Sequence, residues 1–78
     1  MKVKCLVEKI EAIEITIPDR FRKLAVPHPW EHPELTDADY AECADIVAAI
    51  TGYDWDEDAD CHLLSVECVD NGEMMLEL

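Results

Sequence analysis

The densest group of side chains that could do chemistry is a run of carboxylates between residues 54 and 60. The run comprises Asp54, Asp56, Glu57, Asp58 and Asp60. Calcium-binding loops use alternating carboxylates, with glycine at the sixth position and a bidentate glutamate at the twelfth. Counted from Asp54, these positions hold Ala59 and Ser65, which supply neither the sharp turn nor the closing ligand. We therefore expect a solvated acidic loop or a surface for Lys and Arg side chains, with calcium binding as an alternative.

A second group has the atom types that bind zinc, which needs four converging ligands, usually thiolates and imidazoles. Its members are His28, His32, Cys43, Cys61, His62 and Cys68. The apolar stripe of a predicted helix places Cys43 in the core, and the alternation of a predicted strand places Cys68 there. A free cysteine in the core packs as a small apolar residue. A zinc protein stays an alternative, and our main expectation is that the chain holds no metal or other cofactor.

No residue pattern in the chain identifies an enzymatic activity. Carboxylates are so numerous that no pair stands out as a general acid and base. A nucleophilic Cys–His pair is not accompanied by an oxyanion-hole motif. The only glycines are Gly52 and Gly72, so the sequence has no glycine-rich phosphate loop. We therefore predict that the protein is not an enzyme.

The charges of the chain are divided between its two parts. All six basic residues lie within the first 23 positions, together with four of the nineteen carboxylates. That segment is about +2 (six minus four), residues 24–78 are −15, and the sum is the net charge of −13. Such an excess repels itself and attracts positive surfaces. It argues against direct binding to nucleic acid or anionic lipid, and it predicts a basic protein partner.

Two tryptophans are candidate anchors for that partner. Trp30 lies in a proline-rich stretch and Trp55 in the acidic run. Tryptophan is enriched at interface hot spots, and a proline-stiffened loop presents its ring at low entropy cost, although either ring can instead close the edge of the core. The predicted partner-binding set is Trp30, Asp37, Asp39, Glu42, Asp45, Asp54, Trp55, Asp56, Glu57, Asp58 and Asp60.

The length of 78 residues, half of them apolar, predicts one acidic domain over residues 1–78 with one modest core. Glu8 interrupts the basic start before an apolar signal-peptide region forms. No stretch approaches the roughly 20 apolar residues of a membrane helix. We therefore expect no membrane association, a cytoplasmic location and free cysteine thiols.

The first 17 residues read as a β-hairpin. Residues 3–7 and 13–17 alternate in polarity, which predicts antiparallel strands joined around residues 8–12. The predicted register pairs Val7 with Ile13, Cys5 with Ile15 and Val3 with Ile17. The connection contains no Gly, Asn or Pro, and a helix over residues 8–12 stays an alternative.

Two helices are expected in the middle of the chain. Thr16 could cap a short one that passes through Phe21 and Leu24 and ends before Pro27. Residues 27–33 contain three prolines and predict a stiff extended loop. The main helix begins after Thr36, with Asp39 at its third position, and ends near Thr51 with Gly52 as its cap. Its predicted apolar stripe is Tyr40, Cys43, Ala44, Val47, Ala48 and Ile50.

The last segment reads as a second hairpin, in which Leu64, Val66 and Cys68 face the core. A three-residue turn at residues 70–72, with Gly72 in the left-handed position, segregates apolar from polar side chains better than a two-residue turn. The favoured register pairs Cys68 with Met74, Val66 with Leu76 and Leu64 with Leu78. The expected fold is therefore α+β: a four-stranded antiparallel sheet of two hairpins, with one main and one short helix on one face, in the order ββ(α)αββ.

The leading functional expectation is a non-enzymatic acidic module that binds proteins. In size and charge the chain resembles the small acidic inhibitors that phages and mobile elements make against restriction or CRISPR nucleases. That resemblance implies mimicry of nucleic acid on a basic host surface, such as that of a nuclease. The alternatives are the metal-binding protein above and a structural or antitoxin-like subunit whose exposed strand edge pairs with another chain. The oligomeric state is open.

Overall fold

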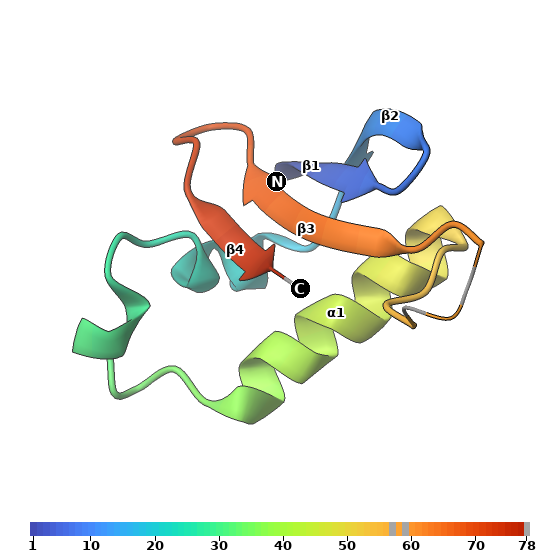
Figure 1. The fold of residues 1–78 in the computed structure, drawn as a ribbon. Helices are drawn as coiled ribbons and strands as arrows, with labels where there is room; N and C mark the ends of the chain where they lie inside the picture. Colours follow the sequence, from blue (N-terminus) through green and yellow to red (C-terminus); the bar gives the residue numbers. More distant parts are fainter. Residues whose placement is uncertain (57, 59, 78) are drawn as a thin grey trace.

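The computed structural model of the protein describes residues 1–56, 58 and 60–77. Its elements are β1 (Lys2–Val7), β2 (Ile10–Thr16), the 3-10 helices η1 (Asp19–Leu24) and η2 (Pro29–Glu31), α1 (Asp37–Thr51), β3 (Leu63–Cys68) and β4 (Met74–Glu77). The strands form an antiparallel sheet in the order β2-β1-β3-β4, and α1 crosses one face of it (Figure 1). The predicted fold class and element order are confirmed.

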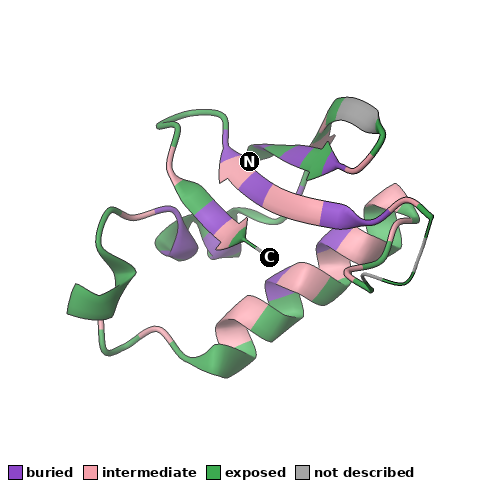
Figure 2. Ribbon diagram, viewed as in Figure 1, coloured by how far each residue is buried: buried purple, intermediate pink, exposed green. Residues whose placement is uncertain are grey.

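The core lies between that face of the sheet and the helices. Along β1 the residues alternate between exposed and buried, as Figure 2 shows, because successive side chains of a strand point to opposite faces. The fully buried side chains are Val3, Cys5, Val7, Leu24, Cys43, Val47, Leu63, Val66 and Cys68. Burial disfavours the thiolate and raises the pKa of Cys5 and of Cys43 to about 11, so both behave as apolar packing groups.

The predicted register of the first hairpin is wrong by two residues. Val3 lies opposite Ile15 and Cys5 opposite Ile13, and the helical alternative for residues 8–12 is also wrong because β2 begins at Ile10. The turn is short because Lys9 adopts a left-handed conformation with φ of 66°. Tight hairpin turns require positive φ, and glycine normally supplies it. A shift of two residues keeps the same side chains on the inner face.

The short segments between β2 and α1 differ in detail from the prediction. The predicted short helix through Phe21 and Leu24 is present as η1, but Thr16 does not cap it. Thr16 is the last residue of β2 and pairs with Lys2, and Pro18 occupies the cap position. The proline-rich segment is not simply extended, because it contains the single turn η2, and proline is well tolerated in the first turn of a helix.

The boundaries of α1 are confirmed by its caps. Thr36 Oγ1 accepts from the backbone N–H of Asp39, and Asp39 Oδ2 accepts from the N–H of Thr36, so the capping box is complete. Gly52 ends the helix with φ of 77°. The predicted stripe is wrong at Ile50, which is 49% exposed, because the last turn of α1 extends past the part that Val47 anchors to the core.

The second hairpin is confirmed in its turn and corrected in its register. Gly72 has φ of 72°, and Val66 lies opposite Leu76 as predicted. A bulge in β4 places Glu67, and not Cys68, opposite Met74. Another irregularity, between β1 and β3, turns Leu63 inward where Leu64 was predicted. The predicted partner of Leu64, Leu78, lies outside the described residues.

Candidate acidic protein-binding surface

The basic residues of η1 neutralise part of the predicted acidic surface. Arg20 forms an ion pair of 2.6 Å with Glu42, and Lys23 Nζ lies 2.9 Å from Asp39 Oδ1. Both carboxylates belong to the first half of α1. The backbone N–H of Thr36, followed by Lys23, lowers the pKa of Asp39 to about 2. Asp39 and Glu42 therefore carry compensated charges, and each forms an ion pair with a basic residue of η1.

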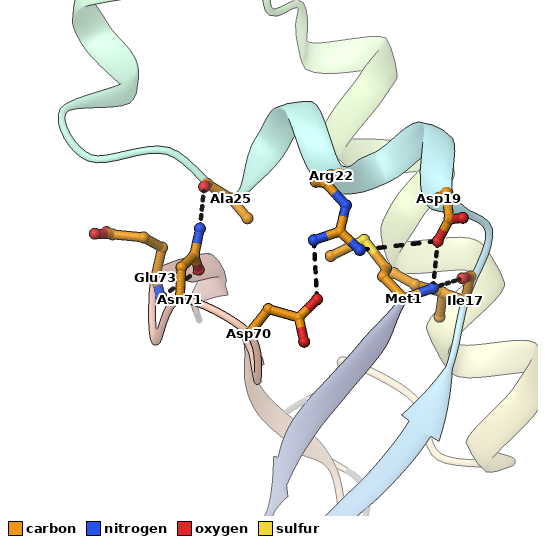
Figure 3. Close-up of polar contacts among 8 residues, drawn as sticks. All are labelled: Met1, Ile17, Asp19, Arg22, Ala25, Asp70, Asn71 and Glu73. Carbon is orange, nitrogen blue, oxygen red and sulfur yellow. Dashed lines mark hydrogen bonds and ion pairs between the residues drawn. The ribbon is translucent and has the colours of Figure 1, made fainter.

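A second group of contacts joins η1 to the N-terminal strand and to the β3–β4 turn (Figure 3). The Met1 amine donates to the carbonyl of Ile17 at 2.8 Å and lies 2.6 Å from Asp19 Oδ1. Arg22 Nη1 donates to Asp70 Oδ2 at 2.9 Å. The Met1 amine is the main reason that the pKa of Asp19 is lowered. We call the contacts of Met1, Asp19, Arg20, Arg22, Lys23, Asp39, Glu42 and Asp70 the η1 junction.

The acidic loop folds back on α1 at the other end of the molecule. Trp55 Nε1 donates to the carbonyl of Ala44 at 3.3 Å, so the loop returns along the C-terminal half of the helix. The backbone N–H of Leu63 donates to the carbonyl of Asp54 at 2.7 Å, and Asp54 forms a β-bridge with His62. Trp55 is half-buried against the core cluster, and its ring thus helps to fix this loop.

The carboxylates at this end are exposed, and none makes an ion pair within the described part of the chain. They are Asp45, Asp54, Asp56, Asp58 and Asp60, which we call the acidic end. Among the described residues, Asp54 and Asp56 accept from the backbone N–H groups of Trp55 and Asp58, at 2.8 and 2.9 Å. The last turn of α1 has no basic residue, so its dipole adds negative potential here.

The remaining predicted residues lie elsewhere or are not described. Glu57 lies outside the described residues. Asp37 is exposed in the first turn of α1, at the opposite end of that helix from the acidic loop. Trp30 sits on η2, at the far side of the molecule from residues 53–56 (Figure 1). The predicted set is therefore divided, and the acidic end is the part that the fold gathers without compensation.

A contact that the sequence analysis missed joins the end of the acidic loop to the turn between β1 and β2. The turn between β1 and β2 meets residues 61 and 62: the N–H of Glu8 donates to the carbonyl of His62 at 2.9 Å, and Cys61 Sγ donates to the carbonyl of Glu8 at 2.6 Å. His62 Nδ1 lies 2.7 Å from Glu8 Oε2 without a well-aligned hydrogen bond. The β1–β2 turn is therefore tied to the two residues that follow Asp60. Only the β1–β3 pairing brings these segments together, so no local pattern signals the contact.

The candidate metal ligands are dispersed. Cys43 and Cys68 are buried in the core, and His28 and His32 flank η2. Cys61 and His62 directly follow the acidic loop in the chain. Among the residues that the structure describes, no three His, Cys, Asp or Glu side chains converge as a metal site would require. Within the same residues, no helix has both the length and the apolar content to cross a membrane.

Comparison of the chain with protein-family models, with curated proteins and with solved structures found no match.

Proposed function

We propose that the protein is a non-enzymatic binding module whose acidic end occupies a basic surface of another protein. One observation carries the proposal: the fold compensates acidic residues at the η1 junction and leaves five exposed carboxylates without an ion pair, among described residues, at the acidic end. Uncompensated charge raises the energy of the compact molecule. A partner that supplies Lys and Arg side chains would relieve that cost.

The mechanism would be electrostatic and steric. Carboxylates accept charge-assisted hydrogen bonds from Arg and Lys much as phosphates do, so a surface evolved for nucleic acid can accept the acidic end. Long-range attraction would speed association at low salt, and salt would weaken it by screening. The hydrogen bond from Trp55 to Ala44 holds the loop to the helix, which limits the ordering entropy lost on binding.

The finer proposal is that the partner is a nucleic-acid-binding protein of a host cell, such as a restriction or CRISPR nuclease. Its support is the resemblance in size and charge to the acidic inhibitors of such enzymes. A protein that fills the nucleic-acid channel would block it without any chemical step.

The test is affinity capture from a nuclease-treated lysate with three forms of the protein. The first is the wild type, and the second replaces Asp54, Asp56, Asp58 and Asp60 with Asn. The third, a matched control, replaces Glu14, Glu31, Glu34 and Glu67 with Gln. Both variants have a net charge of −9 (−13 plus four), so they differ only in where the charge is removed.

We expect the wild type and the control to retain basic nucleic-acid-binding proteins, which added duplex DNA or raised salt releases. The Asp-to-Asn variant should lose them. Equal capture by the two variants would show that only total charge matters, and capture insensitive to DNA would contradict mimicry. Circular dichroism of all three forms checks that each is folded.

A further inference from the structure

A groove lies between the proline-rich segment and β4, away from the acidic end. It is shallow, with a volume of about 340 Å³, and its walls include Val26, Pro29 and Trp30 on one side and Met74 and Met75 on the other. Trp30 is 77% exposed and Met74 is 44% exposed. A contiguous patch of exposed apolar side chains marks an interaction site more often than scattered single side chains do.

The chain holds Trp30 outward at a conformational cost. His28 has φ of 54°, a left-handed conformation that is unfavourable for a non-glycine residue and more so before a proline. The turn is closed by backbone bonds from the N–H of Glu31 to His28 and from that of His32 to Pro29, at 2.9 and 3.0 Å. The His28 ring lies 4.9 Å from the Trp30 ring and supports it. Strain that the surroundings maintain at an exposed ring is typical of a functional site.

The other wall of the groove is an open strand edge. β4 is the last strand of the sheet and has β3 as its neighbour on one side. The opposite side of such a strand presents backbone N–H and C=O groups that a further strand can pair with. Glu73 and Glu77 also line the groove, and none of the described residues that line it is Lys or Arg. The groove therefore offers backbone pairing, apolar contact and negative charge together.

We propose that the groove binds an extended segment of a partner protein in which Lys or Arg residues alternate with apolar ones. The segment adds to the sheet as a strand beside β4, and its backbone pairs with the free edge. Its apolar side chains pack on Trp30 and Met74, and its cations pair with Glu73 and Glu77. A second copy of the chain is disfavoured as the occupant by charge repulsion, because each copy carries −13.

This site is independent of the proposed function. The groove lies between η2 and β4, whereas the segment that carries Asp54 and Asp56 follows the opposite end of α1 (Figure 1). Variants at one site leave the other intact, so the two proposals can fail separately.

The experiment titrates isotope-labelled protein with a short synthetic peptide in which lysine and valine alternate. We expect amide shifts in β4 and a shift of the Trp30 indole N–H. Trp30→Ala should weaken binding about tenfold or more, as expected for a hot-spot tryptophan. Ile50→Ala removes another exposed apolar side chain, at the other end of α1, and should leave the affinity unchanged.

Two altered peptides test the mode of binding. A peptide with prolines in place of the central valines cannot donate to β4 and should not bind. A peptide with glutamate in place of lysine should not bind either. The proposal is overturned if β4 does not respond, if Trp30→Ala binds like the wild type, or if the shifts are confined to residues 54–60. Equal binding of the proline peptide would also overturn it.

Discussion

The η1 junction and the acidic end are both rich in carboxylates, but the fold treats them in opposite ways. At the junction Asp39 and Glu42 lie within 3 Å of basic side chains from a segment some 16 to 22 residues away. At the acidic end no carboxylate of the described residues has such a partner. The comparison teaches that net charge is a property of the chain, whereas available charge is a property of the fold.

The largest expected effect is the loss of stability when the apolar contacts that hold η1 in place are removed. Leu24 is fully buried, so Leu24→Ala should lower the free energy of unfolding by about 3 kcal/mol through lost apolar contacts and a residual cavity. Arg22→Gln should cost much less, because the pair with Asp70 is exposed. Urea denaturation of both variants measures the difference. Equal losses would mean that ion pairs, and not apolar packing, hold η1 at the junction.

A smaller effect is expected at the start of α1, where the junction and the capping box share Asp39. Thr36→Ala removes the acceptor for the Asp39 N–H and should cost about 1 kcal/mol. Thr36→Ser keeps a hydroxyl acceptor and should recover most of the loss. Thermal denaturation separates them. If the alanine and serine variants unfold at the same temperature, the capping hydrogen bond does not contribute to stability.

Removal of carboxylate charge should change the free energy of unfolding in opposite directions at the two regions. Asp39→Asn should destabilise the protein, because it weakens the contact with Lys23. Asp56→Asn combined with Asp58→Asn should stabilise it by up to about 0.5 kcal/mol at low salt, because it relieves repulsion. Added salt should reduce the stabilisation. Denaturation at low and high ionic strength measures both, and changes of the same sign would remove the distinction between the regions.

The smallest effect concerns the pH at which Asp39 stabilises the fold. Its pKa is about 2 in the folded protein and close to 4 in an unfolded chain. Its contribution is therefore complete above about pH 4 and is lost as the pH falls towards 2. The difference in unfolding free energy between the wild type and Asp39→Asn should shrink over that range. A difference that is constant from pH 6 to about 2 would contradict the assigned pKa.

The sequence predicted well those features that depend on neighbouring residues. Thr36, Asp39 and Gly52 define α1 because capping needs only residues a few positions apart. Gly72 marks its turn because a left-handed conformation favours glycine. A turn was predicted around residues 8–12, but its tight form at Lys9, and hence the register, was not, since a lysine in that conformation is uncommon.

The candidate site was predicted only in part. The acidic run is visible in the sequence, but its return along α1 depends on the contact of Trp55 with Ala44, eleven positions away. The compensation of Glu42 by Arg20 and the placement of Trp30 far from Trp55 are likewise products of packing. Residue types show which charges exist, and spatial neighbours decide which of them are compensated.

By itself, the amino-acid sequence determined the strands, the main helix, its caps and the division of charge between residues 1–23 and 24–78. These follow from side-chain periodicity and from the steric limits of the backbone, which act over a few residues. The tertiary structure alone decided that β1 pairs with β3, that η1 takes its partners from α1 and the β3–β4 turn, and that the acidic end stays exposed. Those outcomes depend on contacts between distant segments, which form only when a common core brings them together.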